Sequence, residues 1–169
     1  GSARQFVQEA HPGSIAMFMN GCSGDQNPYP RRTLDLAKQH GRALANGVET
    51  ALLTKMKTEL RGPLQVAFKN VALRFAEPPK RKDLEIQAQS GNKYIRIHAR
   101  GLLDELDAHG HIKTEFDRFP LQVARFGDDL ILVGICGEAV VDYSVRCKQE
   151  LSDGSQIAVW TAGYCNDVF

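Results

Sequence analysis

The sequence lacks most of the motifs and compositional features that directly identify a protein class. It has four cysteines in 169 residues and no C-x-x-C pair, which argues against a structural zinc knuckle. It has no H-E-x-x-H motif, no internal repeat and no low-complexity tract. Its longest strongly apolar run, Leu130–Cys136, is too short to cross a bilayer, so we expect no integral membrane segment. No amphipathic membrane helix stands out either.

The sequence also lacks an excess of charge of either sign. Lys and Arg number 21 and Asp and Glu number 20, for a formal net charge of +1. A balance this close gives no broad electrostatic case for a nucleic acid or an anionic membrane as a partner. The sequence leaves the compartment and the oligomeric state open. A secreted or periplasmic location of the parent protein is one of the alternatives for the compartment. Gly1-Ser2 resembles an expression scar, so we expect any targeting segment to lie outside this sequence.

What is present fits a folded α/β chain. The composition is 43% hydrophobic, 24% charged and 8% aromatic, as in globular domains. Alternating elements predict a layered mixed β-sheet with flanking helices over residues 1–169, either a single domain or a fragment of a larger α/β catalytic domain. The expected elements are a strand at 14–20, a helix at 33–60, one or two strands within 64–76, helices within 83–108, a hairpin of strands 120–125 and 130–136, a helix at 138–151 and a strand at 156–162.

Two helical details carry expectations of their own. Thr33 is a suitable N-cap for the helix at 33–60. Its apolar stripe predicts one buried face, made of Leu34, Ala37, Leu44, Val48, Leu52 and Met56. Gly41 and Gly47 interrupt this helix and are interpreted as points of close packing.

Polar residues follow three of the expected strands where each leaves the core. They are Asn20, Asp25 and Asn27 after the first, Glu138 after Leu130–Cys136, and Asn166 and Asp167 after the last. Ligands of open α/β sheets bind outside the carboxyl ends of the strands. If these strands lie side by side and point the same way, the three acids converge, as suits a divalent cation or acid/base chemistry.

Glu138 and Asp25 are the two strongest candidates among the acidic residues, and each also has a purely structural interpretation. Glu138 sits where a strand leaves the core, but an acid there can simply complement the dipole of the following helix. Asp25 lies between Gly24 and Gln26 and can simply stabilise an Asx-turn. Cys22 as a nucleophile would need a histidine partner, and no histidine sits in an obvious partner loop. Core packing accounts for Trp160 and Tyr164.

Three motifs resemble those of the neutral/alkaline (non-lysosomal) ceramidase family, and more closely its bacterial ceramidase-like relatives. They are Asn20-Gly-Cys-Ser-Gly-Asp25-Gln-Asn27-Pro28, Gly137-Glu138 and Cys165-Asn166, in order within residues 14–169. The resemblance implies a zinc-dependent amidase that splits ceramide, a sphingolipid, into sphingosine and a fatty acid. A small-molecule or lipid amide is then the expected substrate.

The resemblance also assigns roles to residues. Glu138 matches the family's glutamate ligand of zinc, while the two histidine ligands belong upstream of Gly1 and the tyrosine ligand just beyond Phe169. Asn27 stands where the family has its serine nucleophile candidate, so Asn27 and Asp25 are the expected catalytic residues. Asn20, Cys22, Gly24 and Asn166 are expected to line the substrate. Asn27 cannot attack a carbonyl, but its amide can donate a hydrogen bond to one.

Two other interpretations remain. In one, the same loops form a non-catalytic ligand-binding or scaffold module. In the other, the acids only cap helices and turns. For the hydrolase interpretation, one carboxylate does not hold zinc alone. We therefore expect the isolated chain to lack a tight zinc site and to have little or no activity.

Overall fold

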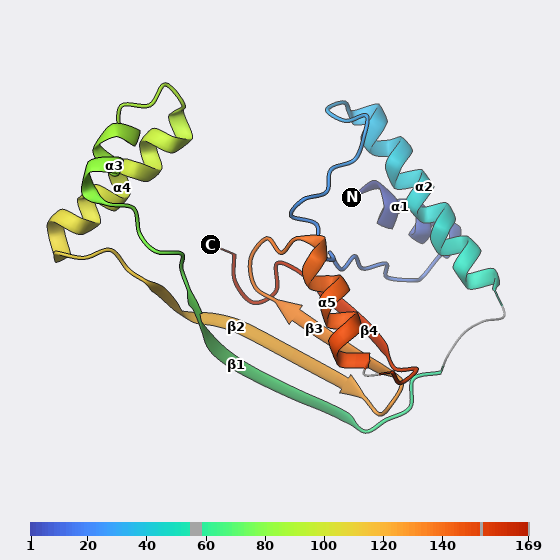
Figure 1. Cartoon of the computed structure of the whole chain (residues 1–169). Helices are drawn as coiled ribbons and strands as arrows, with labels where there is room; N and C mark the ends of the chain where they lie inside the picture. The colour runs from blue at the N-terminus through green and yellow to red at the C-terminus, as the bar shows by residue number, and fades with distance from the viewer. Residues whose placement is uncertain (55–58, 153, 169) are drawn as a thin grey trace. The chain divides into compact units, whose positions relative to one another are not determined.

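The chain divides into two compact units in the computed structural model, which describes residues 1–54, 59–152 and 154–168. Unit 1 combines residues 1–69 with 120–169, and unit 2 is the intervening 70–119. The described part is mixed α/β, with five helices and a four-stranded mixed sheet (Figure 1), so the predicted fold class is confirmed. The division into two units was not evident in the sequence.

The sheet has the strand order β1-β2-β3-β4. The strands are β1 (Leu64–Arg74), β2 (Glu115–Phe126), β3 (Leu130–Ile135) and β4 (Ala158–Ala162). β2 and β3 form an antiparallel hairpin, whereas β3 and β4 are parallel. The predicted hairpin is confirmed, and β1 is one continuous strand rather than two.

α5 (Val141–Ser152) connects β3 to β4 and packs against β4. Parallel neighbours need such a crossover, because a tight turn can join only antiparallel strands. β3 is the most buried element of unit 1, as its apolar run Leu130–Cys136 predicts. The helix predicted at 138–151 begins three residues later, so Glu138 lies in the connecting loop and not in the first helical turn.

The N-terminal part of unit 1 is a pair of helices, α1 (Ser2–Ala10) and α2 (Leu34–Leu53), which pack on each other. Thr33 caps α2, since its hydroxyl accepts a hydrogen bond from Leu36 N at 3.2 Å. Gly41 lies against α1, where an added Cβ would come within 2.7 Å of Ser2 Cβ. Gly47, in contrast, has nothing within 4 Å, so only Gly41 marks close packing.

Two predictions about apolar segments of unit 1 are wrong. Residues 14–20 form no regular strand, and most of their apolar side chains are exposed. α2 ends at Leu53 rather than at residue 60, and the four stripe residues Leu34, Leu44, Val48 and Leu52 are exposed. Met56 lies outside the described residues. A periodic apolar pattern shows which side chains can be buried together, but it does not supply the surface that buries them.

Unit 2 has a small core of its own between two helices, α3 (Arg81–Gln87) and α4 (Lys93–His109). The predicted break between them at 90–92 is confirmed. Asn92 caps α4 by accepting a hydrogen bond from Tyr94 N at 2.9 Å, and Gly110 ends it with a φ of 76°. The core consists of Leu84, Ala88 and Ala99, with Leu102, Leu103 and Ile112 packed around it.

Within the described ranges, no helix is both long enough and apolar enough to cross a membrane.

Candidate functional site

Three loops from distant parts of the sequence meet at one end of β3 and β4. Gly24 N donates to Ala139 O at 2.9 Å, and this bond ties the loop after residue 20 to the loop before α5. Gly163 N donates to Asn20 O at 3.2 Å, and Tyr164 N donates to Gly137 O at 2.9 Å. The structure therefore places the 20–25 loop beside Gly137-Glu138, although residues 14–20, which were expected to form the strand leading to this loop, form none.

A line of side-chain hydrogen bonds runs across this junction and ends on Glu138. Asn20 Nδ2 donates to Ser23 Oγ at 2.9 Å, and Ser23 bonds in turn to the Tyr164 side chain. The Tyr164 hydroxyl donates to Glu138 Oε1 at 2.7 Å. We call these four residues the Glu138 relay. The last bond of this line gives Oε1 of the exposed Glu138 carboxylate a hydrogen-bond donor.

The hydrogen bond to Glu138 raises the pKa of Tyr164 above its usual value, and partial burial adds to the effect, while the bond from Ser23 opposes it. Tyr164 also has a φ of 58°, in the left-handed region that side chains other than glycine rarely adopt. Such conformations persist only where the surroundings enforce them, and they gather at functional sites. Arg32 and Asn166 also have a positive φ, but only Tyr164 of these three donates a hydrogen bond to Glu138.

Replacing Tyr164 with phenylalanine is expected to reduce the amount by which the free energy of unfolding falls as the pH rises above about 10. The pKa of Tyr164 in the folded chain lies above its ordinary value of 10.0. Its contribution to stability is therefore complete below pH about 10 and is lost as the pH rises through the folded value. Urea unfolding across this range should show a steeper decline for the wild type than for Tyr164→Phe. Equal declines would contradict the assigned hydrogen bond.

Asp25 has a structural partner in this junction. Its Oδ1 accepts a hydrogen bond from Val141 N at 3.1 Å, at the first residue of α5. A carboxylate there satisfies a backbone N–H that the helix itself leaves without a partner, and it complements the helix dipole. Asp25 thus acts as a cap supplied from 116 residues away, rather than as the local turn acid of the structural interpretation.

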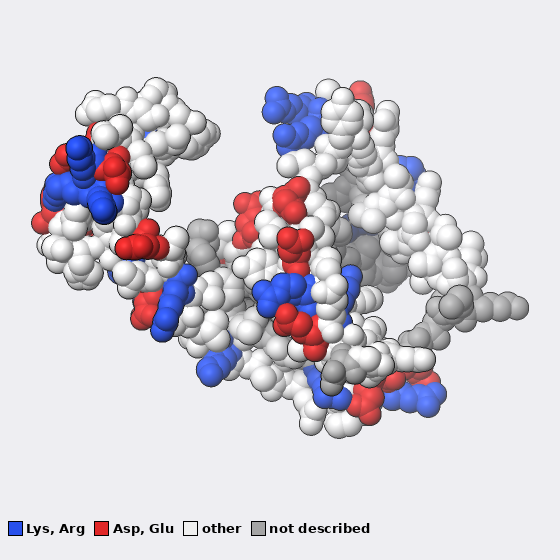
Figure 2. All heavy atoms as spheres, in the orientation of Figure 1, with Lys and Arg blue, Asp and Glu red and all other residues white. Residues whose placement is uncertain are grey.

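Glu138 is the exposed residue between buried Gly137 and Ala139. Acidic side chains gather over the start of α5 in Figure 2, and those of this region are Asp25, Glu138 and Asp142. In the part of the chain that the structure describes, no three His, Cys, Asp or Glu side chains are placed to hold a metal ion together. The described residues therefore do not by themselves form a zinc site.

The remaining predicted site residues have other surroundings. Cys22 is buried, and burial raises the pKa of its thiol, with a further contribution from Cys147, so it is an unreactive group inside unit 1. The side-chain Oδ1 of Asn27 accepts a hydrogen bond from Arg31 Nη1. Asn166 Nδ2 donates to Gln122 Oε1 at 3.2 Å, toward β2. All four cysteines of the chain are free.

Sequence reasoning missed two members of the Glu138 relay, Ser23 and Tyr164. An aromatic residue just after a strand looks like a core residue, and a serine inside a glycine-rich loop looks like a turn residue. The signal that could have identified Ser23 and Tyr164 was their position in the sequence. Tyr164 follows the end of β4 by two residues, and Ser23 follows Asn20 by three, so both lie close in sequence to residues already predicted for the site.

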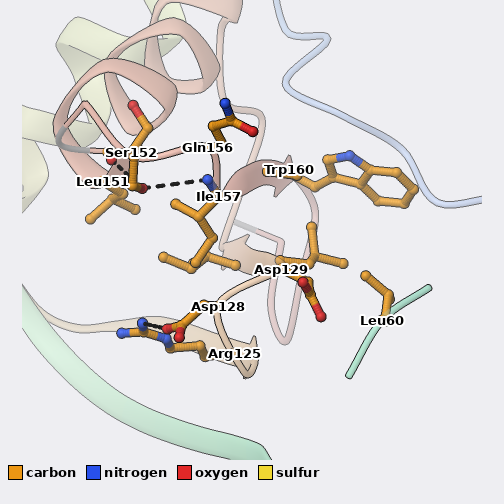
Figure 3. A pocket seen from close by; sticks show the side chains of 13 residues that line it. Leu60, Arg125, Asp128, Asp129, Leu151, Ser152, Gln156, Ile157 and Trp160 are labelled. Atoms are coloured by element: carbon orange, nitrogen blue, oxygen red, sulfur yellow. Dashed lines mark hydrogen bonds and ion pairs between the residues drawn. The ribbon is translucent and has the colours of Figure 1, made fainter. Parts of the chain in front are cut away.

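A cavity of about 990 Å³ lies at the opposite end of β3 and β4 (Figure 3). Trp160 lines it and is 56% exposed, so the expectation that this residue packs in the core is wrong. Arg125 and Asp128 at the rim pair with each other at 2.7 Å. None of the 13 lining residues belongs to the predicted site or to the Glu138 relay.

Comparison with known proteins adds no name to this site, because no protein-family model, curated protein or solved structure matches the chain.

Proposed function

We propose that this chain supplies part of the active site of a zinc-dependent amidohydrolase, similar to neutral ceramidases and acting on an N-acyl amide. The observation that carries the proposal is the Glu138 relay. Four residues from three loops hold one carboxylate at an exposed position beside the 20–28 motif. The resemblance makes Glu138 a zinc ligand and puts the other three ligands outside residues 1–169.

Three residues of the chain have tasks in this proposal. Tyr164 donates to Oε1 of Glu138, which orients the carboxylate. Asp25 fixes the 20–25 loop against α5 through Val141 N. The Asn27 side-chain amide is the donor for the carbonyl of the scissile amide, since its oxygen is engaged by Arg31. Zinc, when bound, would polarise that carbonyl and supply the nucleophile.

The test is Glu138→Gln in a polypeptide that extends beyond residues 1–169 on both sides. Zinc content and release of fatty acid from an N-acyl sphingosine are both measured. We expect activity to fall by more than about a hundredfold, because even residues that only orient a metal ligand are worth about 10–100-fold. Asp142→Asn, in the first turn of α5, is the matched control and should keep both.

Two results would contradict the proposal. One is a Glu138→Gln protein that still holds stoichiometric zinc and turns over substrate. The other is sub-micromolar zinc binding by residues 1–169 alone in a calorimetric titration, since a single carboxylate ligand cannot provide it.

The alternative is a non-catalytic binding or scaffold module built on the same loops. The cap that Asp25 places on Val141 supports it, because this acid then serves the fold and not a reaction. Absence of zinc from the extended polypeptide, with the Glu138 relay intact, would favour the module.

A further inference from the structure

The charges of α4 run against its helix dipole. Helices are stabilised by acids in the first turn and by bases in the last. α4 has no acid in its first turn, and its first two turns read Lys93-Tyr-Ile-Arg-Ile-His-Ala-Arg100. Its acids, Asp104, Glu105 and Asp107, come only afterwards. Of these basic residues, Arg96 has a structural role, because its Nη1 donates a hydrogen bond to Ser90 O at 2.7 Å. Lys93, in the first turn, is unfavourable to the helix dipole.

The helical period divides these first turns into two faces. Ala99, Leu102 and Leu103 point toward the core of unit 2. At about 100° per residue, the opposite side carries Lys93, Tyr94, Ile97, His98 and Arg100. Tyr94 is 80% exposed and Ile97 57%. The outward face therefore combines an aromatic ring and a branched aliphatic chain with two long cations.

Further apolar side chains lie at the same end of the hairpin. Ile86 is in the last turn of α3 and Ile95 in the first turn of α4, so both adjoin the connecting turn, and both are exposed. Among the residues that the structure describes, Lys93 and Arg100 have no carboxylate ion-pair partner. On the face drawn in Figure 2, the region where α4 begins is almost entirely white, so neither acidic nor basic side chains dominate this view of it. We call this end, with Ile86 and residues 93–100, the hairpin end.

We propose that the hairpin end of unit 2 binds the surface of an anionic lipid bilayer. Tyrosine and isoleucine side chains insert at the boundary between headgroups and acyl chains, while lysine and arginine remain among the anionic headgroups. Each basic residue near such a surface adds to the attraction, which decays within a Debye length. The net charge of the whole chain is near zero, so it does not reveal the local excess of basic residues at the hairpin end. The inference stands apart from the proposed hydrolase activity.

The test is co-flotation of the chain with vesicles of phosphatidylcholine alone or of equal parts phosphatidylcholine and phosphatidylglycerol. We expect binding to the anionic vesicles, weakened about tenfold or more when salt rises from about 0.05 M to about 0.5 M. The double variant Lys93→Glu/Arg100→Glu should lower the partition coefficient by at least about tenfold. Tyr94→Ser/Ile97→Ser should lower it several-fold while keeping the salt dependence.

The matched control is Lys38→Glu/Lys148→Glu, which reverses two exposed lysines on α2 and α5 and should bind like the wild type. All substituted side chains point outward, and circular dichroism checks that each variant is folded. Equal binding to neutral and anionic vesicles, no binding to either, or equal loss in the control variant would each overturn the proposal. Because none of these readouts involves turnover, a negative result leaves the hydrolase proposal untouched.

Discussion

Replacing Gly24 with alanine is expected to destabilise unit 1 by about 2–3 kcal/mol. A Cβ at this position would lie 2.6 Å from Glu138 O and 3.1 Å from Ala139 O, two backbone atoms held by the start of α5. Backbone atoms cannot rotate away as a side chain can, so the two loops must separate. Separation also strains the 2.9 Å bond from Gly24 N to Ala139 O. Urea unfolding followed by the fluorescence of Trp160, the single tryptophan, measures the change.

Gly47→Ala is the control for this result. Gly47 lies in α2 with nothing within 4 Å, so alanine there should stabilise the chain by about 0.5–1 kcal/mol through helix propensity. Gly24 does not have a left-handed φ, so its expected effect is steric rather than conformational. A Gly24→Ala variant as stable as the wild type would show that the loops do not approach this closely.

Truncating Leu84 to alanine is expected to cost unit 2 about 3–4 kcal/mol. Leu84 is fully buried at the centre of the cluster formed by α3 and α4. Removing three carbon atoms forfeits their transfer free energy and leaves a cavity that two short helices cannot easily close. Hydrogen exchange of the α3 and α4 amides, measured by mass spectrometry, should show the loss of protection.

Ile86→Ala, two residues along the same helix, is the matched control. Ile86 is 65% exposed, so its truncation should change stability by no more than about 0.5 kcal/mol. If the two variants exchanged at the same rate, the cluster around Leu84 would not be the core of unit 2.

Local chemistry made some elements predictable and not others. The Gly127-Asp128-Asp129 turn between two apolar runs gave the β2–β3 hairpin, and the break at 90–92 separated α3 from α4, because both signals lie within a few residues. The strand at 14–20 failed because a strand needs a neighbour, and no property of those seven residues says whether one is present. The stripe on α2 failed for the same reason.

The candidate site was predictable in outline only. Polar residues after apolar runs located Asp25 and Glu138 at one junction, since the ends of β3 and β4 set that position. Hydrogen-bond partners depend on backbone angles that sequence does not show, such as the left-handed φ of Tyr164. The residue that touches Glu138 was therefore taken for a core aromatic. The metal and substrate assignments rest on the resemblance and stay predictions.

The Asp25–Val141 bond closes a span of 116 residues, which gives the junction a high contact order. The entropy of closing so long a loop must be met before this bond and its neighbours can contribute. We therefore expect the junction to be among the last parts of unit 1 to assemble. A small molecule bound across it would hold both ends of that span and should raise the melting temperature by an amount that grows with the logarithm of the ligand concentration divided by its Kd. Thermal-shift screening of amide compounds against residues 1–169 thus becomes an assay for ligands that needs no turnover.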